Sequence, residues 1–432
     1  MREDRPTLTV AIVGFGTVGQ SVARIICDGE HPSLRLSHIC NRQIERKRVG
    51  WVPSSVVWTE DYGDILAADI DVVVETLGGL DPAREWIQNA LTAGKSVVTA
   101  NKQVIAHHGP ELDLIAASNG QSLRFEAAVA GGIPIIQGLQ EGLAGDSLFR
   151  VLGILNGTCN YILTRMETDG ASFSAALEEA QLLGFAEADP TADVDGYDAQ
   201  AKLAILATVG LDRPVDVTHI PLRTIRTVEA VDFVYAARLG CTIRQVSRVE
   251  ALPEASGVLA SVQPALVPRA SMLARVEGSQ NIVIVEGRFG GETAFSGFGA
   301  GGEPTACAVV SDLEAIARRG PRGSYPNAVS DAPSPALSAV VSDFVAPHYV
   351  RCVVADRPGI IAALAGVFSH YEINVDSVLQ EPGWDKHELP TVITLESCDS
   401  AMMERAVREL AGFDFHVRPP LWMPVLATGD TG

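Results

Sequence analysis

The sequence predicts an α/β protein in three parts: a parallel sheet covered by helices, an α+β domain, and a small C-terminal unit of βαββαβ order. Two observations lead to this prediction. Short apolar runs alternate with helical patterns from residue 7 to about 130, which is typical of βαβ units and a parallel sheet. Beyond a stretch rich in Pro, Ser, Gly and Ala, the patterns follow the order of a ferredoxin-like unit. At 432 residues the chain is also too long for one compact core.

The individual elements follow from these patterns. Apolar runs predict strands of the first sheet at 7–13, 34–40, 71–76, 96–101 and 123–129, with helices at 18–27, 82–94 and 110–120. Helices are expected over much of 134–210, and a strand at 281–289. The last unit is expected to have strands at 349–355, 373–380, 391–397 and 414–420, and helices at 359–372 and 400–412. We place the domains at 1–132, 133–320 and 347–428, with 321–346 as a linker.

Composition excludes several classes of partner. The formal net charge of −20 argues against nucleic acid and against an anionic membrane surface, because both require basic patches. The seven cysteines are odd in number and form no CxxC pair, which indicates reduced thiols rather than a disulfide framework or a zinc site. No segment has the features of a signal peptide, and none reaches the ~20 apolar residues of a membrane span. We expect a cytoplasmic protein.

A glycine-rich turn links the first predicted strand to the first helix. Gly14, Gly16 and Gly19 form GxGxxG at this position, where the glycines permit a tight turn, close approach to a pyrophosphate, and packing of helix on strand. The helix N-terminus adds free N–H groups for phosphates. These features predict a Rossmann-type dinucleotide-binding domain; the alternative is a βα turn with glycines for steric reasons alone. The predicted cofactor contacts are Gly14, Gly16, Thr17, Val18, Gly19, Arg42, Thr76, Thr99 and Lys102.

The end of the second strand bears on which dinucleotide binds. A carboxylate at this position would hold the ribose 2′-hydroxyl of NAD. The sequence instead has Asn41 and Arg42, with Arg46, Lys47 and Arg48 close behind. A cluster of cations suits a 2′-phosphate, so we predict NADP rather than NAD, with Arg42 as the contact. The alternative is that these cations are only solvated surface charges.

An acidic stretch precedes one lysine in an otherwise uncharged run. The five carboxylates are Glu187, Asp189, Asp193, Asp195 and Asp198, and the lysine is Lys202. Asp198 and Lys202 are four residues apart, so they can meet on one helix face, and a partly buried lysine has a tunable pKa. We predict Lys202 as a general acid for carbonyl reduction. Lys102, at the end of a predicted sheet strand, is expected at the crevice edge.

The acidic stretch also permits simpler interpretations. An exposed Asp198–Lys202 pair would contribute only about 0.3–0.5 kcal/mol to stability. A calcium loop does not fit the spacing, because aligning Gly196 to the loop glycine puts Lys202 where the bidentate glutamate belongs. Asp189 before Pro190, and Asp195 before Gly196, can be turn residues.

Six blocks of the sequence together resemble the homoserine dehydrogenase family. They are "GFGTVG", "AGKSVVTANK", "FEAAVAGGIPII", "GILNGTCNYIL", "LGFAEADPTADVDGYDAQAKLAIL" and "GFGAGGEPTACAVVSDL", in order over roughly residues 8 to 318. The resemblance implies NAD(P)H-dependent reduction of L-aspartate 4-semialdehyde to L-homoserine, on the pathway to threonine and methionine. It also implies an assembly of two or four copies, that is, a homodimer or homotetramer.

The resemblance assigns residues by position. Lys202 would donate the proton to the aldehyde oxygen, with Lys102 and Asp198 as its catalytic companions. The substrate site would be lined by Glu187, Asp193, Gly157, Thr158 and Tyr161. "FEAAVAGGI" is similar to the family's monovalent-cation loop (Na or K), which implies mainly backbone oxygen ligands from Glu126, Val129, Gly131 and Ile133. Two positions depart from the family pattern: Ala201, where Arg or His is common, and Phe298, where proline is usual.

The last unit resembles an ACT domain. "VADRPGIIAALAGVF" is similar to the first strand, loop and helix of that family. The resemblance implies threonine as an effector, bound near Asp356, Pro358 and Gly359 and acting through a shift between conformations. The alternative is an ACT domain that is only structural or dimerising.

Two rival functions remain at this point. Another Rossmann reductase of amino-acid-derived carbonyls would not explain the "NGTCNYIL" and "EADP" blocks together. An amino-acid sensor without catalysis would need none of Lys102, Glu187, Asp198 or Lys202.

Overall fold

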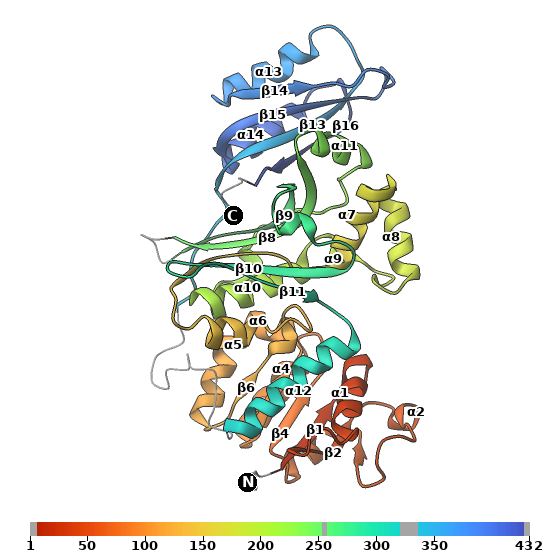
Figure 1. Ribbon diagram of the computed structural model, residues 1–432, viewed down its shortest axis with the longest axis vertical. Helices are drawn as coiled ribbons and strands as arrows, with labels where there is room; N and C mark the ends of the chain where they lie inside the picture. The colour runs from red at the N-terminus through yellow and green to blue at the C-terminus, as the bar shows by residue number, and fades with distance from the viewer. Residues whose placement is uncertain (1–6, 253–256, 320–335, 427–432) are drawn as a thin grey trace.

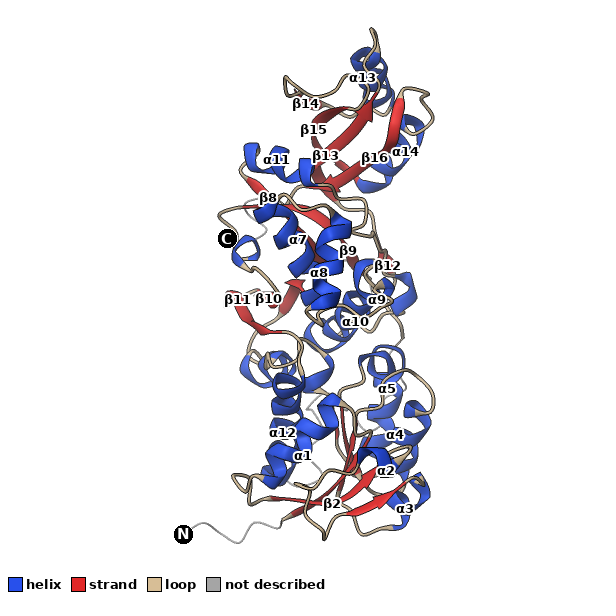
Figure 2. Cartoon of the chain, turned by 90° about the vertical axis from the view of Figure 1, so that its right-hand side faces the viewer, coloured by secondary structure: helices blue, strands red, loops and turns tan. Residues whose placement is uncertain are grey.

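The computed structural model describes residues 7–252, 257–319 and 336–426. These residues form three stacked parts along the long axis of the molecule (Figure 1). The parallel sheet lies at one end, a second sheet lies in the middle, and the C-terminal unit lies at the other end. The view at right angles has the same order, with helices on both sides of the first sheet (Figure 2).

The first sheet has six parallel strands in the order β3-β2-β1-β4-β5-β6, a doubly wound arrangement. Its alternate strands and helices confirm the predicted fold class for this part. The three central strands β1, β4 and β5 are buried along their whole length and rich in Val and Ile, as expected of strands covered on both faces. Their bounds are β1 Leu8–Val13, β2 Leu34–Cys40, β3 Val57–Thr59, β4 Val72–Glu75, β5 Ser96–Thr99 and β6 Leu123–Arg124. The helices are α1 Thr17–Cys27, α2 Ile44–Lys47, α3 Tyr62–Ala67, α4 Ala83–Thr92 and α5 Lys102–Ser118.

The second sheet is mixed and has the order β11-β10-β7-β8-β9-β12. Its strands are β7 Leu148–Ile154, β8 Cys241–Ala251, β9 Val258–Pro268, β10 Gln280–Gly287, β11 Gly291–Phe298 and β12 Val340–Val341. The helices of this part are α6 Ile135–Gln137, α7 Gly157–Asp169, α8 Phe173–Leu182, α9 Thr191–Val194, α10 Tyr197–Leu211 and α11 Ala230–Arg238. β12 pairs with β9, so the end of the predicted linker adds a strand to this sheet; most of that linker lies outside the described residues.

The C-terminal unit has the predicted βαββαβ order. Its elements are β13 Val345–Val354, α13 Ile360–His370, β14 Val375–Leu379, β15 Leu389–Asp399, α14 Ser400–Leu410 and β16 His416–Pro424. The strands form an antiparallel sheet in the order β14-β15-β13-β16, which is the ferredoxin-like topology. Side chains of this sheet, Tyr349 and Met423 among them, pack with Tyr235 of α11 in one apolar cluster.

α12 Gly302–Arg319 follows β11 of the second sheet in sequence but packs on the first part of the protein. The chain leaves β11 in the second sheet and returns to the first part, where α12 lies beside α1 (Figure 1). Val309 and Leu313 of α12 share an apolar core with Val10 and Val22. The segment 133–320, grouped by sequence as one domain, therefore contributes its last helix to the dinucleotide-binding part in space.

One predicted strand is wrong over most of its length. The run 123–129 is a strand only at Leu123–Arg124, and a 3₁₀ turn follows at Glu126–Ala128. The backbone N–H of Glu126 donates to Asp312 of α12, and the Glu126 carboxylate accepts from the N–H groups of Ile136 and Gln137. These contacts, remote in sequence, replace the ladder that the apolar pattern predicts.

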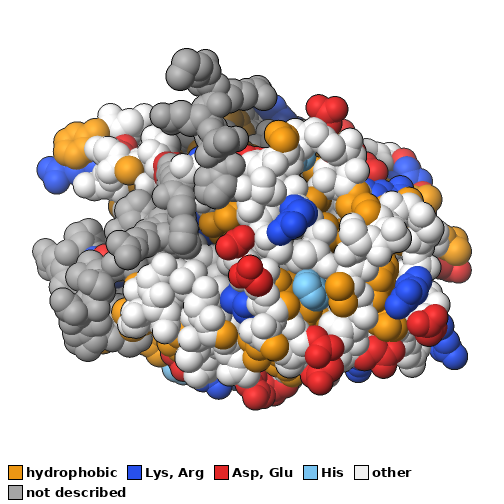
Figure 3. Space-filling model, turned by 90° about the horizontal axis from the view of Figure 1, so that it is seen from below, with side chains coloured by type: hydrophobic (Ala, Val, Ile, Leu, Met, Phe, Trp, Pro, Cys, Tyr) orange, Lys and Arg blue, Asp and Glu red, His pale blue; other side chains and the backbone are white. Residues whose placement is uncertain are grey.

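The face at the first-domain end carries side chains of both charge signs. Acidic, basic and apolar side chains are interspersed over the part of this face that Figure 3 draws in colour. Although the net charge of the chain is −20, this face carries Lys and Arg side chains as well as Asp and Glu.

Candidate active site

Asp198 lies between two lysines that come from different parts of the protein. Lys202 Nζ contacts Asp198 Oδ2 at 2.7 Å, and Lys102 Nζ contacts Asp198 Oδ1 at 2.8 Å. Lys202 and Asp198 are on α10, whereas Lys102 is the first residue of α5, directly after β5. The predicted pairing of Asp198 with Lys202 is confirmed, and Lys102 joins the same carboxylate.

The two helices bring these groups together at the junction of the first two parts. α5 and α10 pack against each other between the first and second sheets (Figure 1). Asn101 caps α5 by accepting from the N–H of Val104, which sets the position of Lys102 at the helix start. α10 is buried around most of its circumference, so the stem of Lys202 lies among apolar side chains. Its ammonium also donates to the carbonyl of Leu155 at 2.8 Å.

The charges in this group stabilise one another. Burial opposes ionisation of Asp198, but Lys202 and Lys102 outweigh it and hold the pKa of the carboxyl well below its usual range. The Asp198 carboxylate in turn raises the pKa of Lys102 above its ordinary value, against the opposing effect of burial. The arrangement therefore keeps the Lys102 ammonium charged at neutral pH.

Asn156 joins this group to a second carboxylate. Its amide donates to Asp193 Oδ1 at 2.7 Å and to Asp198 Oδ2 at 2.9 Å, and its side-chain oxygen caps α7 through the N–H of Cys159. Burial raises the pKa of Asp193, partly offset by the hydrogen bond from Asn156. Sequence reasoning missed Asn156; its position one residue before Gly157, at a helix start after a strand, was the available signal.

The other predicted substrate residues lie around this centre on two segments. Gly157 and Thr158 begin α7, and Thr158 Oγ1 donates to the carbonyl of Phe185 at 2.7 Å. Tyr161 is half-buried, and its ring lies 4.8 Å from the ring of Phe185. Glu187 is exposed, and its charge acts on Lys102.

The remaining two carboxylates of the acidic stretch have local partners. Asp189 accepts from the N–H of Thr191 in the turn before α9. Asp195 accepts from Thr224 Oγ1 at 2.7 Å and from Arg226 Nε at 2.9 Å. Asp189 thus has the expected turn geometry, while Asp195 also ties α9 to a segment thirty residues away in sequence.

The three glycines of the glycine-rich turn differ in what surrounds them. Gly14 has a φ of +96°, and a Cβ there would lie 2.8 Å from the carbonyl oxygen of Thr76. A Cβ at Gly19 would lie 2.1 Å from the carbonyl oxygen of Gly14, so helix and strand need this glycine to pack. Gly16 differs, because no protein atom lies within 4 Å of a Cβ placed there. Its missing side chain leaves open space at the start of α1, the position at which a GxGxxG turn generally meets a dinucleotide phosphate.

The sheet edge next to this turn is polar. Thr76 donates to the carbonyl of Gly14 at 2.7 Å, and Thr99 donates to the buried carboxylate of Glu75 at 2.5 Å. Both threonines therefore have protein partners, and Val18, in the first turn of α1, packs with the first-domain core. Arg42 is exposed at the end of β2, beside Asn41, whose side-chain oxygen accepts from the N–H of Phe15. Glu75, which sequence analysis did not single out, joins the ends of β4 and β5.

The predicted cation loop is a tight turn. Ala130 and Gly131 both have positive φ values, +55° and +51°. A Cβ at Gly131 would lie 2.7 Å from the carbonyl oxygen of Gly299, so the loop packs closely against the chain before α12. Burial and the neighbouring Asp312 raise the pKa of Glu126 to about 7. Within the described residues, no three His, Cys, Asp or Glu side chains are arranged to hold a metal ion; a site of backbone oxygens would not depend on such a group.

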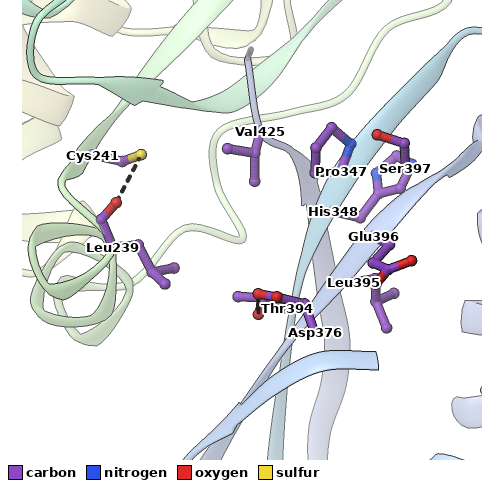
Figure 4. A pocket seen from close by; sticks show the side chains of 10 residues that line it. All are labelled: Leu239, Cys241, Pro347, His348, Asp376, Thr394, Leu395, Glu396, Ser397 and Val425. Atoms are coloured by element: carbon purple, nitrogen blue, oxygen red, sulfur yellow. Dashed lines mark hydrogen bonds between the residues drawn. The ribbon is translucent and has the colours of Figure 1, made fainter. Parts of the chain in front are cut away.

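The predicted effector loop lies at the start of α13. Gly359 has a φ of +95° and is the N-cap residue of this helix. Asp356 forms an ion pair with Lys386, with 3.6 Å between Oδ2 and Nζ. A separate cavity of 590 Å³ lies between the C-terminal sheet and the second part. Figure 4 shows its lining, with Leu239 and Cys241 on one side and residues of the C-terminal sheet, His348 and Glu396 among them, on the other. The lysines of the candidate active site do not line it.

Known protein families match all three parts of the chain. The family model "Homoserine dehydrogenase" matches residues 134–313, "Homoserine dehydrogenase, NAD binding domain" matches 14–126, and "ACT domain" matches 348–414. A homoserine dehydrogenase of Mycobacterium tuberculosis is 42% identical over 393 residues, covering 88% of each chain. The chain belongs to the homoserine dehydrogenase family. A Bacillus subtilis homoserine dehydrogenase is 37% identical over 393 residues, covering 89% of this chain and 90% of its own.

Solved structures of homoserine dehydrogenases share all or most of the fold. The enzyme from Thiobacillus denitrificans is similar with a TM-score of 0.86 and 31% identity, covering 97% of this chain and 98% of its own. A hyperthermophilic archaeal homoserine dehydrogenase in complex with NADPH is similar with a TM-score of 0.62 and 29% identity, covering 72% of this chain and 97% of its own. The chain is thus an NAD(P)-dependent oxidoreductase with an ACT domain. In the part of the chain that the structure describes, no helix is both long and apolar enough for a membrane span.

Proposed function

We propose that this homoserine dehydrogenase reduces L-aspartate 4-semialdehyde to L-homoserine with NADPH, in threonine and methionine biosynthesis. The observation that carries the proposal is the Asp198 carboxylate held between Lys102 and Lys202, where the dinucleotide-binding part meets the second part. Reduction of an aldehyde needs a proton source for the developing alkoxide and positive charge to stabilise it. Two ammonium groups on one carboxylate supply both.

The chain's own residues divide the work as follows. When bound, a reduced nicotinamide supplies the hydride that the aldehyde carbon receives. Lys202 donates the proton to the aldehyde oxygen, which completes the primary alcohol, and Lys102 stabilises the developing negative charge and shares this role. Asp198 orients both ammonium groups through its two carboxylate oxygens and raises the pKa of Lys102. In the reverse direction, the same lysine accepts the hydroxyl proton of homoserine.

The amino-acid end of the substrate binds to the groups around Asp193. Asp193 and Glu187 attract the substrate ammonium, because both are carboxylates close enough to act on Lys102. Gly157 and Thr158 lie at the N-terminus of α7, where free N–H groups suit the substrate carboxylate. Tyr161 closes the side of the pocket next to Phe185.

The test is oxidation of L-homoserine, followed by the absorbance of the reduced nicotinamide, with NADP and NAD in parallel. Turnover with either cofactor supports the proposal, and faster turnover with NADP supports the assignment of Arg42 to the 2′-phosphate. If the folded protein binds nucleotide but turns over neither L-homoserine nor the aldehyde, the proposal is wrong, and a catalytically silent sensor becomes the better account.

We also propose a monovalent cation, Na or K, at the loop of Glu126, Val129, Gly131 and Ile133. The resemblance of this loop and its tight turn at Ala130 and Gly131 support the assignment, since carbonyl oxygens are suitable ligands for hard cations. Replacing KCl by tetramethylammonium chloride at constant ionic strength should lower the melting temperature, and adding back millimolar K or Na should restore it. A melting temperature independent of the cation would contradict this site.

Threonine is the effector that we propose for the ACT domain, at Asp356, Pro358 and Gly359. The exposed loop and the positive φ of Gly359 at the start of α13 leave N–H groups free for a carboxylate. Threonine at millimolar concentration should inhibit turnover. Serine, which lacks the methyl group of threonine, and valine, which lacks its hydroxyl group, should inhibit less. Inhibition that persists unchanged in Asp356→Ala would contradict this location.

We further propose that the protein works in the cytoplasm as a homodimer or homotetramer. All seven cysteines are free thiols, which suits a reducing compartment. The mass of one chain is 45.7 kDa, so light scattering after size exclusion distinguishes two, four and one copies directly. A monomer at micromolar concentration would contradict the assembly.

A further inference from the structure

A buried ion pair joins the ACT sheet to the second part. Arg351 of β13 and Asp232 of α11 meet at 2.7 Å, with the Arg351 side chain 2% exposed and that of Asp232 fully buried. Tyr349 of the same strand donates to the same carboxylate oxygen at 2.7 Å. The attraction of Arg351 only partly offsets the burial that raises the pKa of Asp232. A paired charge that is this deeply buried holds its partners in one geometry, because separating them leaves a buried charge without compensation.

Arg351 also binds the chain that leads into α11. Its guanidinium contacts Glu229 at 3.0 Å and donates to the carbonyl of Thr227 at 2.9 Å. The three nitrogens of the Arg351 guanidinium therefore bind residues of segment 224–229 and of α11, the helix that follows it. We call residues 224–229 the connecting segment.

The other end of the connecting segment holds α9. The N–H of Ile225 donates to the carbonyl of Val194 at 3.1 Å, and Thr224 Oγ1 donates to the same carbonyl at 3.1 Å. Asp195, the residue after α9, accepts from Thr224 and Arg226. α9 is therefore fixed at its C-terminal end by the same segment that Arg351 holds.

α9 carries Asp193 of the candidate active site. The helix is only four residues long, so its own hydrogen bonds cannot fix its position, and contacts with neighbouring chain must do so. Asp193 lies one residue before Val194, and its side chain shares Asn156 with Asp198. A displacement of the connecting segment would therefore move α9 and, with it, the carboxylate of Asp193.

We propose that Arg351, in the ACT domain, is a positioning residue for the substrate site, acting through the connecting segment on Asp193. The inference rests on the proposed role of Asp193 in binding the substrate ammonium. It makes the ACT sheet part of the structure that sets substrate affinity, and not only a site for an effector. Lys102 and Lys202 lie further along, beyond Asn156 and Asp198, and each is also held by its own helix, so the effect is on substrate binding more than on the chemical step.

The test compares Arg351→Met with a matched control in the full-length protein. Arg238 of α11 also pairs with the C-terminal unit, through Glu381, but it is the last residue of the helix, at the end opposite to the connecting segment. Arg351→Met should raise the KM for homoserine about tenfold, with kcat changed less than twofold and the Kd for NADP unchanged. Arg351→Lys, which retains the charge, should restore part of the loss. Arg238→Met should leave all three constants within twofold of the wild type.

Hydrogen exchange gives a second readout that does not use activity. The amide of Ile225 should exchange at least tenfold faster in Arg351→Met than in Arg238→Met, because its bond to Val194 loosens. Thr224→Val keeps the ion pair intact and should also raise the KM, which keeps the proposal testable if Arg351→Met fails to fold. An unchanged KM in folded Arg351→Met and in Thr224→Val, or an equal rise in Arg238→Met, overturns the proposal. Loss of homoserine turnover in the wild type would instead contradict the proposed function, and the exchange comparison would still decide whether the ACT sheet holds α9.

Discussion

Lys202 and Asp198, one turn apart on α10, form a 2.7 Å ion pair in which the two side chains are 10% and 9% exposed. At the surface, a pair of this spacing would contribute little to stability. Here the carboxylate also receives Lys102 from α5, so one buried charge joins two helices and two parts of the protein. The same contacts that stabilise the junction hold the ammonium group of the proposed proton donor in place.

The pH dependence of stability should report this buried carboxylate. The lysines hold the folded pKa of Asp198 below its unfolded value of about 3.9. Its stabilising contribution is therefore complete above that pH and is lost as the pH falls through the folded pKa. Asp198→Asn should lower the free energy of unfolding at pH 7 by about 3–5 kcal/mol, and the difference from the wild type should shrink below about pH 4. Urea titrations measure it, with exposed Glu178→Gln as the control; a difference independent of pH would contradict the depressed pKa.

Gly16→Ala should separate cofactor binding from folding. The added methyl meets no protein atom within 4 Å, and the φ of Gly16 is −83°, so the melting temperature should stay within about 2 °C of the wild type. A bound pyrophosphate needs that space, and the Kd for NADP should rise at least tenfold. Gly19→Ala, whose methyl would lie 2.1 Å from the carbonyl oxygen of Gly14, should instead lower the melting temperature. Unchanged NADP affinity in Gly16→Ala would place the phosphates elsewhere.

Arg42→Ala should reduce the preference for NADP over NAD. A charge-assisted hydrogen bond to the 2′-phosphate contributes about 1.5–3 kcal/mol, so the KM for NADP should rise about tenfold or more, with the KM for NAD nearly unchanged. Steady-state kinetics with both cofactors measure this ratio. Arg46→Ala, in the same cluster but with its guanidinium on Gln43, is the control. An equal loss in both variants would indicate a general effect of surface charge.

Asn156 has two roles that different substitutions separate. Asn156→Ser retains a good N-cap for α7 but loses the amide that donates to Asp193 and Asp198. It should therefore lower kcat/KM at least tenfold with little change in melting temperature. Asn156→Ala should show the same kinetic loss and an additional loss of about 1 kcal/mol in stability, from the missing cap. If Asn156→Ser retains wild-type kcat/KM, the bridge between the carboxylates has no catalytic importance.

Much of the fold was predictable because local pattern and tertiary structure agree. The strand predicted at 34–40 is β2 Leu34–Cys40, and the βαββαβ order of the last unit is confirmed. The strand predicted at 123–129 is wrong beyond Arg124, because the carboxylate of Asp312 and the backbone of α6 take the hydrogen bonds of Glu126. The packing of α12 on the first part could not be predicted either, since it depends on a return of the chain after β11.

The candidate site was predictable only where its members are close in sequence. The spacing of Asp198 and Lys202 predicts their contact, and the strand end predicts the position of Lys102. Asn156 lies 42 residues from Asp198, and no period in the sequence joins them. Asp195 was equally unpredictable: its position before Gly196 is typical of a turn residue, but its carboxylate accepts hydrogen bonds from Thr224 and Arg226, about thirty residues away.

The measurement that tests the central claim most directly is kcat for NADP-dependent oxidation of L-homoserine by Lys202→Met. Methionine retains an apolar stem in the buried position but cannot move a proton. The account predicts a kcat lower by about 10²–10⁴-fold, with the Kd for NADP within twofold of the wild type. A folded Lys202→Met protein with near-wild-type kcat would contradict the assignment of proton transfer to this lysine.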